Sequence, residues 1–124
     1  MTEVRVSDLI YALNDWIDSS PRNNGRDSEA LLWGRVAKLS EEVGEVNAAL
    51  IGITGQNPRK GVSHSLADLE AELWDVALTA VCLVAHLRRN AGEHQDLLRD
   101  LESHIRSVVT RALGGGGTHG GQLI

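Results

Sequence analysis

The sequence predicts an all-α protein, an antiparallel four-helix bundle that occupies residues 1–113 and is followed by a Gly-rich flexible tail over 114–124. Four segments carry apolar residues at three- and four-residue spacing, which is typical of amphipathic helices. The chain lacks the runs of Val, Ile and Thr that strands favour, although 42% of its 124 residues are hydrophobic. The intervening segments are short and rich in Gly, Pro, Asn and Ser, as turns between neighbouring helices are.

Charge and composition exclude several classes of protein. The net charge of −5 argues against binding of a nucleic acid polymer, which needs clusters of Lys and Arg. No stretch of about 20 apolar residues and no apolar signal-peptide core occur, so we expect a cytoplasmic protein with no membrane association. Cys82 is the only cysteine, so we expect no intrachain disulfide and interpret it as an inert packing residue.

The first two predicted helices span residues 4–18 and 29–52. Ser7 or Asp8 would cap the first helix, and Asp27 or Ser28 the second. Gly44 in the second helix either permits close helix packing or is simply tolerated. The expected core residues are Val6, Leu9, Ile10, Leu13, Trp16 and Ile17 in the first helix, and Trp33, Val36, Leu39, Val43, Val46, Leu50 and Ile53 in the second.

The third and fourth predicted helices span residues 66–90 and 93–113. The third has two apolar faces with a polar stripe between them, so we expect it to be buried on two sides. Because one four-helix layer does not cover both faces, a symmetric homo-oligomer, at least a dimer, is expected. The stripe comprises Asp68, Glu72, Asp75, Thr79 and His86, the last of which we interpret as a hydrogen-bonded or interface histidine.

Two acidic motifs are the main candidates for function. Glu41, Glu42 and Glu45 occupy one arc of the second helix, where like charges repel by roughly a few tenths of a kcal/mol per pair. Glu72 and Asp75 lie in an otherwise apolar helix, where buried carboxylates need a cation. Acidic runs commonly mark a solvated face, but together the motifs predict a site for Mg²⁺ or Mn²⁺.

The motif order resembles the MazG-like family of all-α nucleoside triphosphate pyrophosphohydrolases. The pattern E-E-x-x-E, a spacer and E-x-x-D reads here as Glu41-Glu42-Val43-Gly44-Glu45, 26 intervening residues, and Glu72-Leu73-Trp74-Asp75. The resemblance implies Mg²⁺-dependent cleavage of a nucleotide substrate between the α and β phosphates. It also implies homo-oligomers, either dimers or tetramers, with sites near subunit contacts.

The resemblance also implies roles for individual residues. Metal ligands would be Glu42, Glu45, Glu72 and Asp75, and Glu41 would be an outer ligand or the base that activates water. Lys38 would neutralise a phosphate or pair with a glutamate. The base-binding candidates are Trp16 and Trp33, which are otherwise core or interface residues, and Thr79, where several relatives carry an aromatic residue.

The connection over residues 52–65 has two interpretations, a solvated link or a mobile flap whose Lys60 contacts substrate phosphates. The activity also has alternatives. One is phosphoribosyl-ATP pyrophosphohydrolase activity, which uses the same bundle and acidic motifs. The other is a non-catalytic module that binds a nucleotide or a protein.

Overall fold

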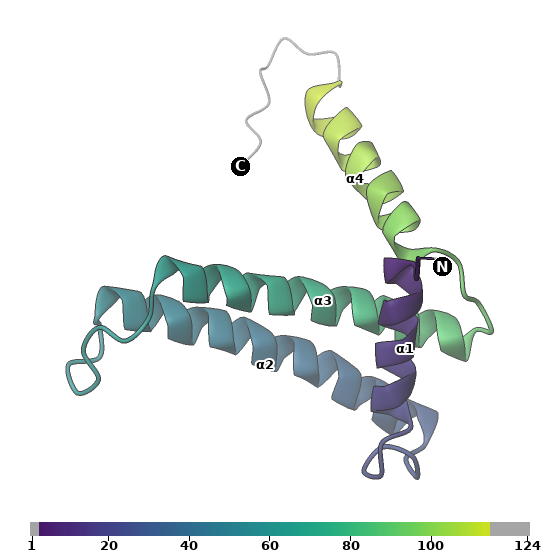
Figure 1. The fold of residues 1–124 in the computed structure, drawn as a ribbon, viewed down its shortest axis with the longest axis horizontal. Helices are drawn as coiled ribbons and strands as arrows, with labels where there is room; N and C mark the ends of the chain where they lie inside the picture. The colour runs from purple at the N-terminus through teal and green to yellow at the C-terminus, as the bar shows by residue number, and fades with distance from the viewer. Residues whose placement is uncertain (1–2, 115–124) are drawn as a thin grey trace.

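Four α-helices form the regular structure in the computed structural model, which describes residues 3–114 (Figure 1). They are α1 (Val6–Asp18), α2 (Ser28–Thr54), α3 (Leu66–Asn90) and α4 (Leu97–Leu113), and no strand occurs within the described range. The predicted all-α class is therefore confirmed. Apart from Gly114, the tail predicted over 114–124 lies outside the described residues.

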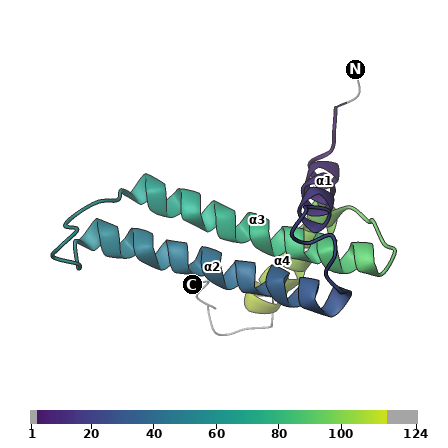
Figure 2. The same cartoon turned by 90° about the horizontal axis from the view of Figure 1, so that it is seen from below.

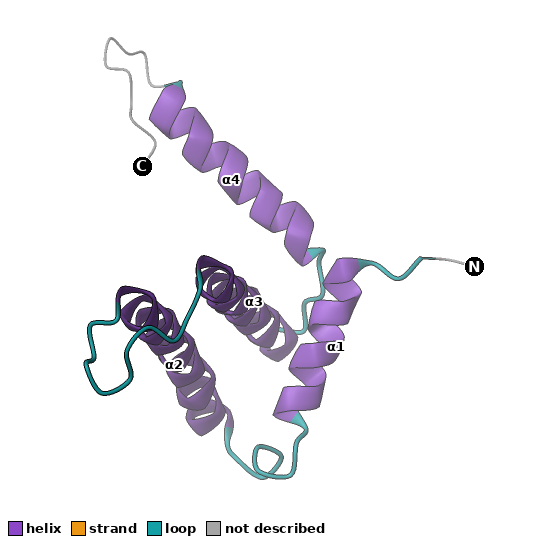
Figure 3. Cartoon of the chain, turned by 60° about the vertical axis from the view of Figure 1, so that its left-hand side comes forward, coloured by secondary structure: helices purple, strands orange, loops and turns teal. Residues whose placement is uncertain are grey.

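The helices α2 and α3 lie side by side and are joined at one end by the connection over residues 55–65 (Figure 1 and Figure 2). Near the opposite end of this pair, α1 crosses and packs mainly on α3. The last helix, α4, leaves from that same end and points away from the α2–α3 pair (Figure 3). None of the described helices is long and apolar enough to cross a membrane.

Local capping interactions explain where α2 and α3 begin. The backbone N–H of Ala30 donates to Asp27 Oδ1 at 2.8 Å, so Asp27 rather than Ser28 caps α2. In front of α3, the Ser65 hydroxyl accepts from the Asp68 N–H while the Asp68 carboxylate accepts from the Ser65 N–H. This reciprocal capping box satisfies two backbone donors that a helix start leaves open.

Two predicted helix starts were wrong. The first helix begins at Val6 after Arg5, without a side-chain cap, and Ser7 instead accepts a hydrogen bond of 2.9 Å from the N–H of Leu97. The fourth helix begins at Leu97 rather than at residue 93. Asp96 sets this start, because its carboxylate accepts hydrogen bonds from the backbone N–H groups of Leu98 and Arg99, each at 3.0 Å.

The buried core is small and lies where α1, α3 and the start of α4 meet. Tyr11 is 3% exposed, and its hydroxyl donates to the carbonyl oxygen of Gln95 at 2.8 Å, which ties α1 to the segment before α4. The buried apolar residues of this core are Ile10, Tyr11, Cys82, Ala85 and Leu97, with Leu13, Ile17 and Val81 packed against them.

Much of the predicted core surface remains uncovered in the single chain. Trp33 and Trp74 are 72% and 69% exposed, and half of the Leu50 side chain is accessible. Gly44 has no neighbouring atom within 4 Å of a built Cβ, so it does not mediate a close helix contact within the chain. These burial predictions were wrong for the single chain, because α4 diverges and covers neither α2 nor the adjoining face of α3.

Candidate functional site

Three carboxylates from the two acidic motifs meet across the α2–α3 pair. Glu42 projects from α2, and Glu72 and Asp75 project from α3, where their three-residue spacing puts them on one face. One carboxylate oxygen from each lies within 4.8 Å of the others, close enough to bind one cation. The acids of the third helix were expected to be buried or in a cleft; Asp75 is exposed in the single chain, and Glu72, like Glu42, is half-buried.

The charges in this cluster act on each other. Desolvation, followed by the negative charges of Asp75, Glu45 and Glu42, raises the pKa of Glu72 above its usual range. The His64 imidazole acts in the opposite direction but does not cancel the shift. Glu45 therefore lies near Glu72, although its carboxylate is not one of the three that meet. An all-oxygen donor set with excess negative charge fits Mg²⁺ or Mn²⁺.

Lys38 borders the cluster on the side of α1. Its ammonium lies 3.0 Å from Glu42 Oε1 and 3.3 Å from Glu41 Oε1, so the predicted pairing with a glutamate is observed. The hydrogen bond to Glu42 is the main reason that the pKa of Lys38 is raised. Glu41 itself is largely exposed and lies outside the three meeting carboxylates.

A cavity of about 440 Å³ opens between α1, α2 and α3, next to the carboxylates. Three of the predicted site residues line it, namely Trp16, Lys38 and Thr79. Lys38 is one helical turn before Glu42, and Thr79 is one turn after Asp75, so the cavity begins about 6 Å from the acids along each helix. Its remaining lining consists of Leu13, Ile17, Asn23, Arg26, Ala30, Leu31, Gly34, Arg35, Leu78 and Cys82, so no acidic side chain among the described residues faces it.

Two other predicted substrate-binding residues lie elsewhere. Trp33 is exposed on α2 and does not line the cavity. Lys60 lies in the connection beyond Thr54, which is about 18 Å along α2 from Glu42. There it lines a separate 210 Å³ hollow with Gly52 and His64. The structure thus joins Trp16, Lys38 and Thr79 to the acidic cluster but leaves Trp33 and Lys60 apart from it.

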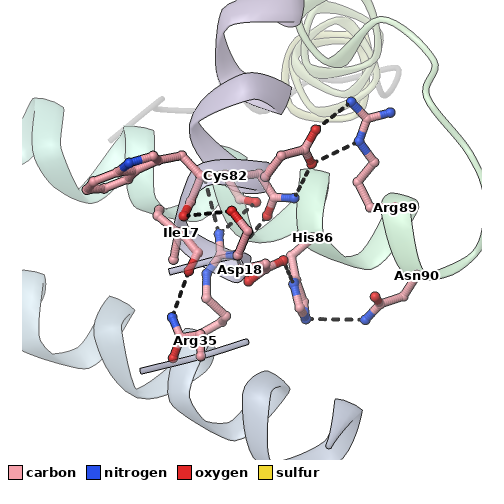
Figure 4. Close-up of polar contacts among 12 residues, drawn as sticks. Ile17, Asp18, Arg35, Cys82, His86, Arg89 and Asn90 are labelled. Carbon is pink, nitrogen blue, oxygen red and sulfur yellow. Dashed lines mark hydrogen bonds and ion pairs between the residues drawn. The ribbon is translucent and has the colours of Figure 1, made fainter. Parts of the chain in front are cut away.

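Sequence reasoning missed a buried polar network beside the cavity, whose lining includes Arg35 and Cys82 (Figure 4). Its centre is Arg35, which is 7% exposed and lies 2.7 Å from Asp18. The other oxygen of Asp18 lies 2.6 Å from His86 Nδ1, and Asn90 lies 3.3 Å from the second nitrogen of that ring. His86 is completely buried, which confirms that it is a hydrogen-bonded histidine.

The sequence holds a weak signal for this network. Arg35 lies four residues from both Leu31 and Leu39, so a charged residue occupies a position in an apolar row of α2. A buried arginine needs a charged and hydrogen-bonding partner, and Asp18 provides it. Cys82 also belongs here, because its thiol accepts from Arg35 at 3.2 Å, and burial raises the pKa of that thiol.

Comparisons of this chain with models of known protein families, with curated proteins and with solved structures find no match to any of them.

Proposed function

We propose that this protein is a Mg²⁺-dependent nucleotide pyrophosphohydrolase of the MazG-like type, with Mn²⁺ as an alternative ion. The reaction would be hydrolysis of an NTP or dNTP between the α and β phosphates, giving a nucleoside monophosphate and pyrophosphate. One observation carries the proposal: the convergence of Glu42, Glu72 and Asp75 one helical turn from a cavity with apolar walls and basic side chains. This arrangement suits a ligand with a planar apolar part and a highly charged anionic part.

The positions of the lining residues support this orientation of the ligand. The cavity would hold the base, with Trp16 offering an indole face for stacking and Thr79 a hydroxyl. Lys38 lies between the cavity and the acids, where its ammonium can exchange a glutamate for a phosphate oxygen. The triphosphate would then extend towards the three carboxylates.

The chemistry would combine positioning with charge stabilisation. The carboxylates of Glu42, Glu72 and Asp75, with Glu45 nearby, would hold the ion. When bound, a divalent cation supplies neutralisation of triphosphate charge and orients water. Glu41, exposed beside Lys38, remains available as an outer ligand or as the base that takes a proton from the attacking water. Water adds across the α–β anhydride bond, and pyrophosphate leaves.

We also propose that the protein is a homo-oligomer, a dimer or tetramer. Beyond the buried Leu97, the apolar side of α4 is uncovered, with exposures between 38% and 58% for its six other large apolar residues. Trp33, Leu50 and Trp74 add uncovered apolar area on α2 and α3. Second copies of the chain would cover these faces and complete the four-helix packing that the single chain leaves open.

Product analysis tests the proposed activity. Purified protein is incubated with Mg²⁺ and a panel of NTPs, dNTPs and modified nucleotides, and monophosphate, diphosphate, pyrophosphate and orthophosphate are quantified. We expect monophosphate and pyrophosphate in equal amounts, with kcat reduced at least about a hundredfold in Glu42→Gln and Asp75→Asn. Glu70→Gln, a matched change at an exposed site on α3 outside the cluster, should retain activity.

Other outcomes would favour the alternatives. Turnover of phosphoribosyl-ATP but not of free NTPs would indicate that the same site is a phosphoribosyl-ATP pyrophosphohydrolase. Mg²⁺-dependent binding of nucleotides without turnover would indicate a non-catalytic module. Orthophosphate release that persists in both cluster variants would contradict the assignment of the site.

A further inference from the structure

The guanidinium of Arg35, a residue of the cavity lining, is held by contacts to both of its terminal nitrogens. Both donors of Nη1 are used, at 2.8 Å to Asn14 Oδ1 and 2.7 Å to Asp18 Oδ1. Both donors of Nη2 face Cys82, at 3.3 Å to its carbonyl oxygen and 3.2 Å to its sulfur. A guanidinium carries five N–H donors, so one remains, on Nε.

No hydrogen bond joins that fifth donor to residues 3–114, and every fully buried side-chain nitrogen or oxygen in this range has a partner, so Nε is not fully buried. Arg35 is more than nine-tenths buried but lines the cavity, so the cavity is the space from which its remaining donor is reached. The group is also rigid, because Asp18 is itself held by the buried His86 on its second oxygen. A fixed donor without a protein partner in the wall of a binding cavity selects for an acceptor on the ligand.

We propose that Arg35 determines base specificity by donating to the carbonyl oxygen at C6 of a purine or C4 of a pyrimidine, so that the site prefers keto bases to their amino counterparts. Guanine, hypoxanthine, uracil and thymine would be accepted ahead of adenine and cytosine. This inference rests on the proposed function, because it assigns the cavity to the base of the nucleotide.

The chemistry of the lining favours this choice. Arginine stays protonated and has no acceptor, so an exocyclic amino group pointing at it would leave two donors facing each other. No carboxylate lines the cavity to accept from such an amino group. Keto bases also carry a ring N–H beside the carbonyl, and the Thr79 hydroxyl and the amide oxygen of Asn23 are lining atoms able to accept from it.

Matched ligand pairs test the proposal in the wild-type protein. ITP and ATP, like UTP and CTP, differ at one keto or amino position and at the ring nitrogen beside it. We expect the keto member of each pair to have at least about tenfold higher kcat/KM. IMP against AMP and UMP against CMP, titrated calorimetrically, should show the same order in Kd. Ratios within twofold of one, or a preference for the amino members, would overturn the proposal.

A variant pair assigns the effect to Arg35. Arg35→Lys keeps the charge but removes the fixed fork, so the keto-to-amino ratio should fall towards one. Arg22→Lys makes the same change at an exposed arginine outside the cavity lining and should leave the ratio as in wild type. An unchanged ratio in a folded Arg35→Lys variant, with folding checked by circular dichroism, would contradict the role. If that variant does not fold, the wild-type ratios decide.

The two assays separate this inference from the proposed activity. Keto preference in the binding experiment without any turnover would overturn the hydrolase proposal and retain the role of Arg35. Turnover with equal rates for both members of each pair would support the hydrolase proposal and overturn the role of Arg35. Absence of both turnover and nucleotide binding would overturn both.

Discussion

Glu72 shows how the acidic cluster can respond to protons. Its pKa is raised first by desolvation and then by the neighbouring Asp75, Glu45 and Glu42 charges. The folded chain therefore favours the protonated carboxyl more than the unfolded chain does. Between the unfolded and the raised folded pKa, the metal-free protein binds more protons when folded, so this group makes stability fall as pH rises through that window.

Metal binding should oppose this effect, which yields a prediction for Glu72→Gln. Because the ion needs the ionised carboxylate, Mn²⁺ affinity of the wild type should weaken as pH is lowered through the raised pKa of Glu72. At pH 7, Mn²⁺ should raise the melting temperature of the wild type but not of Glu72→Gln. Calorimetric titration and thermal melts measure both effects, with Glu70→Gln as control. Wild-type Mn²⁺ affinity in Glu72→Gln would remove this residue from the site.

Two of the three glycines in α2, Gly44 and Gly52, have opposite surroundings. A Cβ at Gly44 would meet no atom within 4 Å, whereas one at Gly52 would overlap the ring of His64 and lie 2.7 Å from Ser63 Oγ. The Ser63 N–H also donates to the Gly52 carbonyl oxygen at 3.0 Å. The end of the connection over residues 55–65 is thus packed on the last turns of α2, and Gly52 provides the space for it.

The same substitution at the two glycines should therefore have opposite effects. Gly44→Ala should raise the free energy of unfolding by up to about 1 kcal/mol, the difference in helix propensity. Gly52→Ala gains the same propensity but should be destabilising, because His64 and Ser63 must move away. Urea unfolding followed by circular dichroism measures both. Equal stabilisation in the two variants would contradict the packed connection, and destabilisation by Gly44→Ala would place a second chain against that surface.

The molecule as a whole is incompletely packed as a single chain. Its core occupies one end of the α2–α3 pair, while α4 projects from that end with its apolar residues accessible (Figure 3). Chains that expose many large apolar side chains commonly bury them against another molecule. The proposed homo-oligomer follows from that surface and is independent of the acidic cluster.

Ile105→Asp tests the assembly. Ile105 is 51% exposed in the single chain, so the change should alter the stability of a monomer by only about 0.5 kcal/mol. In an oligomer that covers α4 it would bury a charge and cause dissociation. Light scattering should give a multiple of 13.4 kDa for the wild type and a smaller mass for the variant. Ser103→Asp, on the opposite side of α4, should leave the mass unchanged. A wild-type mass of one chain at micromolar concentrations would contradict the oligomer.

Helical periodicity and capping were sufficient to predict much of the local structure. The predicted bounds 66–90 agree with α3, and α1 and α2 differ from prediction by one or two residues at their ends. The meeting of Glu42 with Glu72 and Asp75 was also predicted, because both motifs lie on neighbouring helices joined by one connection. These features depend on spacing within a helix and on residues adjacent in sequence, so the sequence contains the information.

Features that depend on distant contacts were not predictable in this way. Burial of Arg35 requires Asp18 from another helix, and the cavity beside it requires α1 to cross near one end of the α2–α3 pair. The exposure of Trp33 and Trp74 follows from the direction in which α4 leaves the core. An apolar pattern identifies a surface that will be covered but does not identify what covers it. The packing of the helices determines that, because burial is a property of all the surfaces that meet.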